Sequence, residues 1–114
     1  MKVGCAVALG IVLVGATSAP VPRVMIGTWA RGSCARPADR LVISPQSAKV
    51  GTAAAAPIVY YPDDDGRGHG AIHWREEGNV DNFVYVRSRD VIVHNTQGYH
   101  MPGRVVYKRC TPSR

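Results

Sequence analysis

Beyond residue 19 this 114-residue sequence has no apolar run of the roughly 20 residues that a membrane-spanning helix needs. Residues 1–19 carry one lysine, a short apolar run from Ala6 to Val14, and small residues at the end. This three-part pattern is typical of a secretory signal peptide. We therefore predict a signal peptide at 1–19 and a mature protein that is periplasmic or secreted, without membrane insertion. Cleavage after Ala16, Ser18 or Ala19 satisfies the small-residue rule, so the mature start stays open.

Cysteine is scarce, with three residues in the chain. Cys5 lies inside the predicted signal peptide, too close to Met1 to be a lipid-modified cysteine that follows a full apolar region. Cys34 and Cys110 remain, and an even pair in a short exported chain predicts one disulfide. Because the bridge would close a long loop, the chain-entropy model credits it with roughly 4 kcal/mol.

Acidic residues are also few: 14 Lys and Arg against 8 Asp and Glu give a net charge of +6. Such a charge favours anionic partners, including acidic proteins, anionic glycans and nucleic acid. The arginines are scattered, however, with no tight run and no interleaved aromatic residues, which argues against a nucleic-acid-binding surface. A mildly basic, solvated surface is the simplest expectation.

Period-two alternation dominates the second half of the chain. Ile72 and Trp74 alternate with His73, and Phe83 and Tyr85 alternate with valines, which indicates strands. The predicted strands are 25–30, 41–44, 58–61, 71–77, 82–88, 90–95 and 103–110. The proline-bearing segment before residue 25 is predicted to be an extended lead-in, and 48–57, with its four alanines, a loose connection.

Short strands at this spacing predict an all-β fold, a small antiparallel meander forming a barrel or a sandwich. Residues 20–114 are long enough for a single domain of this kind. In a closed meander the first and last strands are neighbours, so a bridge between Cys34 and Cys110 would lock the closure and favours the barrel.

No motif for catalysis, metal or cofactor binding is found. The spacings of the four histidines match no ligand pattern, and the acids of 62–70 fail the calcium-loop register. The serines of the mature chain lie in no nucleophile motif, and Glu76 and Glu77 point to opposite faces of a strand. We therefore predict no catalytic residues, no metal site and no cofactor, and expect the protein not to be an enzyme.

Gly27 and Trp29 open the first predicted strand, and this Gly-x-Trp resembles the start of lipocalins and avidin-type barrels. The resemblance implies that Trp29 packs across the floor of a barrel. A broader pattern adds Cys34, a Leu-x-Ile strand and the terminal "YKRC" to the Gly-x-Trp. It is similar to that of small exported β-barrel proteins of alphaproteobacteria, which implies export, fold and bridge but carries no activity with it. The architecture is also similar to that of periplasmic inhibitors of proteases and lysozyme.

The functional expectation is an exported, monomeric, non-catalytic binding module that engages a protein, for example a hydrolase that it inhibits, through its loops. Candidate contact residues in two loops are Arg67, His69, Tyr99, His100 and Met101. One alternative is a lipocalin-like carrier of a small ligand or metal, using a barrel mouth near Trp29 and Tyr60 or the histidines. A further alternative is an envelope-structural protein without a discrete ligand.

Overall fold

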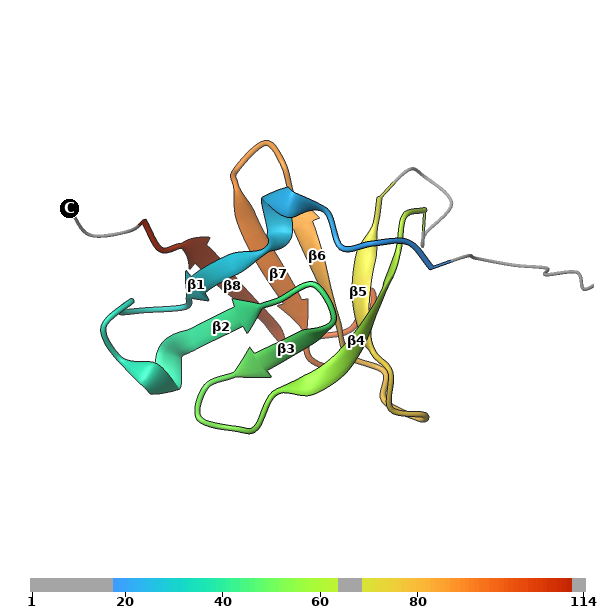
Figure 1. The fold of residues 1–114 in the computed structure, drawn as a ribbon, viewed down its shortest axis with the longest axis horizontal. Helices are drawn as coiled ribbons and strands as arrows, with labels where there is room; N and C mark the ends of the chain where they lie inside the picture. The colour runs from blue at the N-terminus through green and yellow to red at the C-terminus, as the bar shows by residue number, and fades with distance from the viewer. Residues whose placement is uncertain (1–17, 64–68, 112–114) are drawn as a thin grey trace, which may run out of the picture.

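The computed structural model describes residues 18–63 and 69–111. Each strand pairs antiparallel with the next, and the last pairs with the first, so that eight strands form a closed barrel (Figure 1). The strands are β1 (Gly27–Ala30), β2 (Arg40–Ile43), β3 (Ser47–Val50), β4 (Ala56–Tyr61), β5 (Ala71–Trp74), β6 (Asn82–Val86), β7 (Val91–Asn95) and β8 (Arg104–Arg109). The all-β prediction is confirmed, and of the two predicted architectures the chain forms the barrel. The predicted signal peptide, except for Ser18 and Ala19, lies outside the described residues.

One strand was missed by the sequence analysis. β3 lies largely in the segment predicted to be a loose connection, and the exposed alanines follow it rather than form it. A tight turn in which the Ser44 amide donates to the Ser47 carbonyl over 2.8 Å starts the strand. Ala48, 1% exposed, faces the barrel interior while Lys49 is exposed. The alternation was present in the sequence, but the alanine-rich composition masked it.

The barrel interior is filled by side chains. Trp29, Phe83 and Ile92 are each 0% exposed, and every strand contributes at least one buried side chain to the same cluster. An eight-stranded barrel has an interior just wide enough for side chains to fill. The remaining strand residues of the cluster are Leu41, Ile43, Ala48, Ile58, Ile72 and Tyr107.

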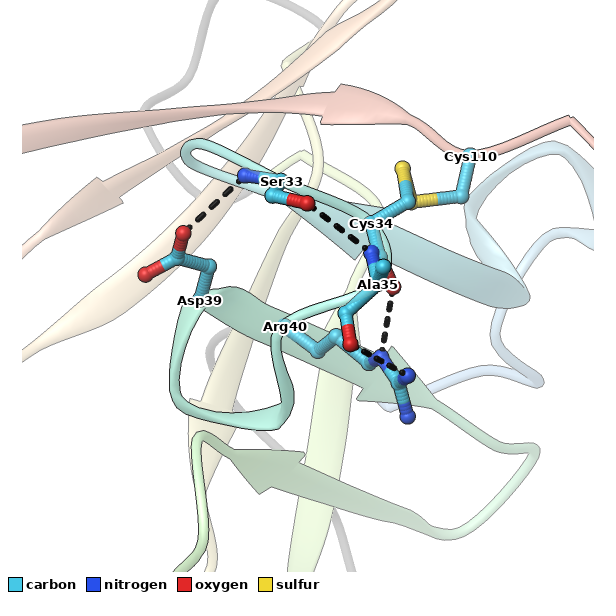
Figure 2. The surroundings of a disulfide bond; sticks show 6 residues. All are labelled: Ser33, Cys34, Ala35, Asp39, Arg40 and Cys110. Atoms are coloured by element: carbon cyan, nitrogen blue, oxygen red, sulfur yellow. Dashed lines mark hydrogen bonds between the residues drawn. A yellow bond between two sulfur atoms is a disulfide. The ribbon is translucent and has the colours of Figure 1, made fainter.

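Closure of the barrel depends on a short seam. β1 and β8 pair at two positions, Trp29 with Arg109 and Ala30 with Lys108, whereas β7 and β8 pair at five. The predicted disulfide joins Cys34 to Cys110 across 76 residues of sequence at this seam. Figure 2 shows how the β1–β2 loop is held in place: Asp39 accepts from the Ser33 amide at 3.0 Å, and Arg40 Nε donates to the Cys34 carbonyl at 2.8 Å. The bridge therefore reinforces one of the two shortest strand boundaries of the barrel, the other being β3–β4.

Residues 18–26, the N-terminal arm, cross one end of the barrel, which we call the arm end. The lead-in predicted from the sequence is paired from its start, since Ala19 pairs with Tyr60 of β4, but it is not extended throughout, because η2 (Arg23–Met25) forms a 3-10 turn. It is blue in Figure 1 and runs from the β4–β5 side to the start of β1. Met25, 2% exposed, packs into the core and its carbonyl accepts from Trp29 Nε1 at 3.1 Å. The φ of +139° at Gly27 is a conformation that residues with a side chain rarely adopt, so this turn into β1 requires glycine.

Candidate binding groove

β6 and β7 carry valines on their outer face as well as apolar side chains on their inner face. β7 is buried at all five positions, although successive side chains of a strand point to opposite faces. Phe83 and Ile92 face inward, whereas Val84 and Val93 are paired neighbours on the outer face. An antiparallel sheet with one solvated face would carry polar residues here. The outer face of β7 is therefore shielded from water by neighbouring parts of the chain, which include the β7–β8 loop.

Two hollows adjoin along β6, the smaller against this outer face and the larger over the edge of β6 at the arm end. The smaller one, of about 230 Å³, is lined by Val84, Val86, Val93, Asn95, Arg104, His69, Tyr99 and His100. The larger one, of about 750 Å³, lies between β6 and the N-terminal arm, and its lining includes Pro22, Val24, Tyr60 and Arg87. His69, Val84 and Val86 line both hollows. We call the two hollows together the β6 groove.

Three of the contact residues predicted from the sequence meet in this groove. His69, from the end of the β4–β5 connection, lines the smaller hollow together with Tyr99 and His100 from the β7–β8 loop. The Tyr99 ring also lies 6.2 Å from the ring of His73, on the outer side of β5. Met101 is 51% exposed and does not line the groove. Arg67 lies outside the described residues.

The groove also contains residues that the sequence analysis did not single out. Its floor is formed by Val84, Val86 and Val93, and Arg104 lies at its rim. A signal for the floor existed in the sequence, because both alternating faces of 83–86 and of 91–93 are apolar. Arg104 gave no such signal, since the chain has many scattered arginines.

The charged side chains in the described lining of the groove are two arginines. Arg104 and Arg87 are exposed, and among the described residues neither forms an ion pair or a side-chain hydrogen bond. No aspartate or glutamate belongs to the described lining of either hollow. The arrangement thus combines an apolar floor, imidazole and phenol side chains, and two unpaired guanidinium groups. This chemistry suits a ligand that is apolar in part and anionic in part.

A second polar cluster lies at the barrel end opposite the arm. His94 Nε2 is 2.7 Å from Asp81 Oδ2, and the imidazole stacks on Phe83 with 4.1 Å between ring centres. Beside it, Asn95 donates to Asn82 over 2.8 Å. An imidazole held by a carboxylate is the arrangement of a general base. Among the described residues, however, Asp81 is the one side-chain hydrogen-bond partner of His94, so no hydroxyl or thiol is positioned for activation.

The described residues include no group of three or more His, Cys, Asp or Glu side chains that could hold a metal ion.

A third cluster secures Trp29 at the arm end. The Arg109 guanidinium lies 4.3 Å from the centre of the Trp29 ring. Its nitrogens donate to both carboxylate oxygens of Asp90, at 3.0 and 2.9 Å, and to the Val24 carbonyl at 2.8 Å. These hydrogen bonds from Arg109, with a further one from Tyr85, lower the pKa of Asp90 to about 2. Trp29 is therefore held at the barrel end by contacts from the arm, the β6–β7 turn and β8.

No helix within the described ranges has the length and apolarity needed to cross a membrane. The disulfide is consistent with an oxidising environment outside the cytosol. In comparisons of the chain with known proteins, no family model, no curated protein and no solved structure matches it.

Proposed function

We propose that the protein is an exported, non-catalytic binding module that engages a protein partner through the β6 groove. The observation that carries this proposal is the meeting of His69, Tyr99 and His100, predicted from two separate loops, around one valine-floored hollow. Rigid strands supply the floor and loops supply the rim, which is the usual arrangement of a recognition site. The smaller hollow, about 230 Å³, is below the usual range of small-molecule pockets, roughly 300 to 1,000 Å³, and is better suited to side chains of a partner.

A small-ligand carrier is the second candidate. The barrel interior is occupied by Trp29, Phe83 and their neighbours, so a ligand would have to bind outside the core. The larger hollow, about 750 Å³ and bordered by Tyr60 and Met25, falls within the range of small-molecule pockets. This hollow supports a carrier function.

Site-specific photo-crosslinking tests the first proposal. Tyr99 is replaced by p-benzoylphenylalanine in the mature, oxidised protein, which is irradiated in a cell-envelope extract; a second protein carries the same probe at exposed Lys49 of β3 as a control. We expect a discrete protein adduct from position 99 and none from position 49. The partner, identified by mass spectrometry and purified, should bind the unmodified protein and lose binding to a Val93→Arg variant. Identical adducts from both positions, or none, would contradict the proposal.

A further inference from the structure

We propose that the β6 groove recognises an extended acidic segment of its partner, with apolar side chains on the valine floor and a carboxylate at each end of the groove. This inference rests on the proposed function and specifies the chemistry of the partner. The segment is about five residues long, because the two unpaired arginines lie roughly 17 Å apart along the strand direction and about 10 Å apart across two strand spacings, and their long side chains span the remainder.

The floor matches the side-chain spacing of an extended chain. Val84 and Val86 are two residues apart on the same face of β6, which places them about 6.6 Å apart along the strand. Alternate side chains of an extended peptide repeat at the same distance. Val93 lies opposite Val84 on β7 and widens this apolar floor.

The edge of β6 also favours an extended partner. β5 begins at Ala71, whose register partner is Val84, so β5 does not reach Tyr85 and Val86. Among the described strands these two residues of β6 pair with β7 alone. The larger hollow lies at this gap, between β6 and the N-terminal arm. A chain entering the gap would lie alongside a strand edge, which is how β-augmentation begins.

The two arginines set the charge and the length of the segment. Arg104 pairs in register with Asn95, which pairs with Asn82 at the start of β6. Arg87 follows the end of β6, five residues beyond Asn82, or roughly 17 Å along the strand direction. Neither guanidinium has an acidic partner among the described residues, and the described lining contributes no carboxylate. A partner with a carboxylate at each end and apolar residues between them would complement both features.

An NMR titration of the oxidised protein tests this inference. The probe is the capped peptide Glu-Leu-Val-Leu-Glu, added to ¹⁵N-labelled protein; Lys-Leu-Val-Leu-Lys and Glu-Ser-Gly-Ser-Glu serve as charge and apolarity controls. We expect the acidic apolar peptide to shift the amide signals of Val84, Val86 and Arg104, and to bind at least tenfold more tightly than either control. An Arg104→Gln or Arg87→Gln variant should bind about fivefold more weakly, since one such contact is worth about 1 kcal/mol. Lys49→Gln, which removes an exposed cation on another wall, should leave the affinity within twofold.

The outcomes separate this inference from the proposed function. If Tyr99 cross-links a protein but the acidic peptide binds no better than the lysine peptide, or if both arginine variants bind normally, the acidic-segment inference is wrong while the proposed function stands. If neither the cross-link nor the peptide titration identifies a ligand at the groove, both are wrong. A single-stranded oligonucleotide that competes with the peptide at equal affinity would also overturn the inference, because charge alone would then explain binding.

Discussion

β2 and β7 share one barrel interior but differ on the outside. β2 alternates between partly exposed and buried residues, as expected of a sheet with one solvated face. β7 is buried at every position. The difference shows that the core alone does not require the second apolar face, since β2 serves the same core without one. The outer face of β7 is instead covered by neighbouring parts of the chain, and the β6 groove lies beside it.

The two regions also differ in how they are held together. β6, β7 and β8 are joined by five register pairs at each boundary, whereas β1 meets β8 at only two. The disulfide, the N-terminal arm and the Arg109 cluster all act at the shorter boundary. The groove side is thus secured by the sheet itself, and the seam is secured by side chains and a covalent bond.

The largest expected effect is on the shared interior. Trp29→Ala removes a fully buried indole that contacts the arm, Tyr85 and Arg109, and we expect a loss of about 3 to 5 kcal/mol in the free energy of unfolding. Urea denaturation monitored by circular dichroism measures it. The Trp29→Phe variant, which keeps an aromatic ring, should lose distinctly less. Equal losses in the two variants would show that ring packing does not matter at this end.

Removal of the disulfide should destabilise the seam next most. The Cys34→Ser/Cys110→Ser double variant frees a 76-residue loop, and we expect a loss of roughly 2 to 4 kcal/mol. Chemical reduction of the wild-type protein serves as the matched control and should give the same loss. Hydrogen exchange should rise first in β1 and β8. If exchange rises first in β6 and β7 instead, the comparison between the two boundaries is wrong.

The fold could be predicted from the sequence to a large extent, because local signals and global topology agree. Alternation located most strands, and the placing of Cys34 and Cys110 indicated closure. β3 was missed because the alanines of 53–56 suggested an irregular segment, while its short alternation of Ala48, Lys49 and Val50 was overlooked. The β3 sequence has a weak intrinsic propensity to form a strand. Its pairing with β2, its pairing with β4 and the burial of Ala48 outweigh this weak propensity.

The groove was predictable only in part. The composition of two loops predicted His69, Tyr99 and His100 as contact residues. No local sequence pattern indicated that these two loops, 30 residues apart, would meet. The outward valines of β6 were read as one face of an ordinary strand. Whether such a face meets solvent or a covering loop depends on how the β7–β8 loop folds back, which is set by tertiary packing.

A matched pair of outward valines tests the comparison directly. Val91 of β7 is 4% exposed, whereas Val42 of β2, also on the outer face, is partly exposed. Threonine keeps the shape and the strand propensity of valine but adds a hydroxyl. We expect Val91→Thr to cost about 1 to 2 kcal/mol, because a hydroxyl buried without a partner is penalised, and Val42→Thr to cost less than about 0.5 kcal/mol. Urea denaturation of both variants decides the point, and equal costs would remove the distinction between the two outer faces.

The smallest expected effect concerns Asp90, in the turn after β6, whose carboxylate links the groove side to the seam through Arg109. Its φ of +51° is tolerated by asparagine as well, so Asp90→Asn removes the charge while keeping the turn. The pKa of Asp90 is lowered to about 2 by the hydrogen bonds from Arg109 and Tyr85. The carboxylate therefore stabilises the fold fully above its unfolded pKa, about 3.9, and this stabilisation is lost as the pH falls through about 2.

The melting temperature of Asp90→Asn should lie below that of the wild type at pH 7, with the difference between the two proteins closing toward pH 2. Glu77→Gln, at an exposed acid, should show little gap at either pH. A gap for Asp90→Asn that persists at pH 2 would mean that turn geometry, and not the charge on Asp90, holds Arg109 over Trp29.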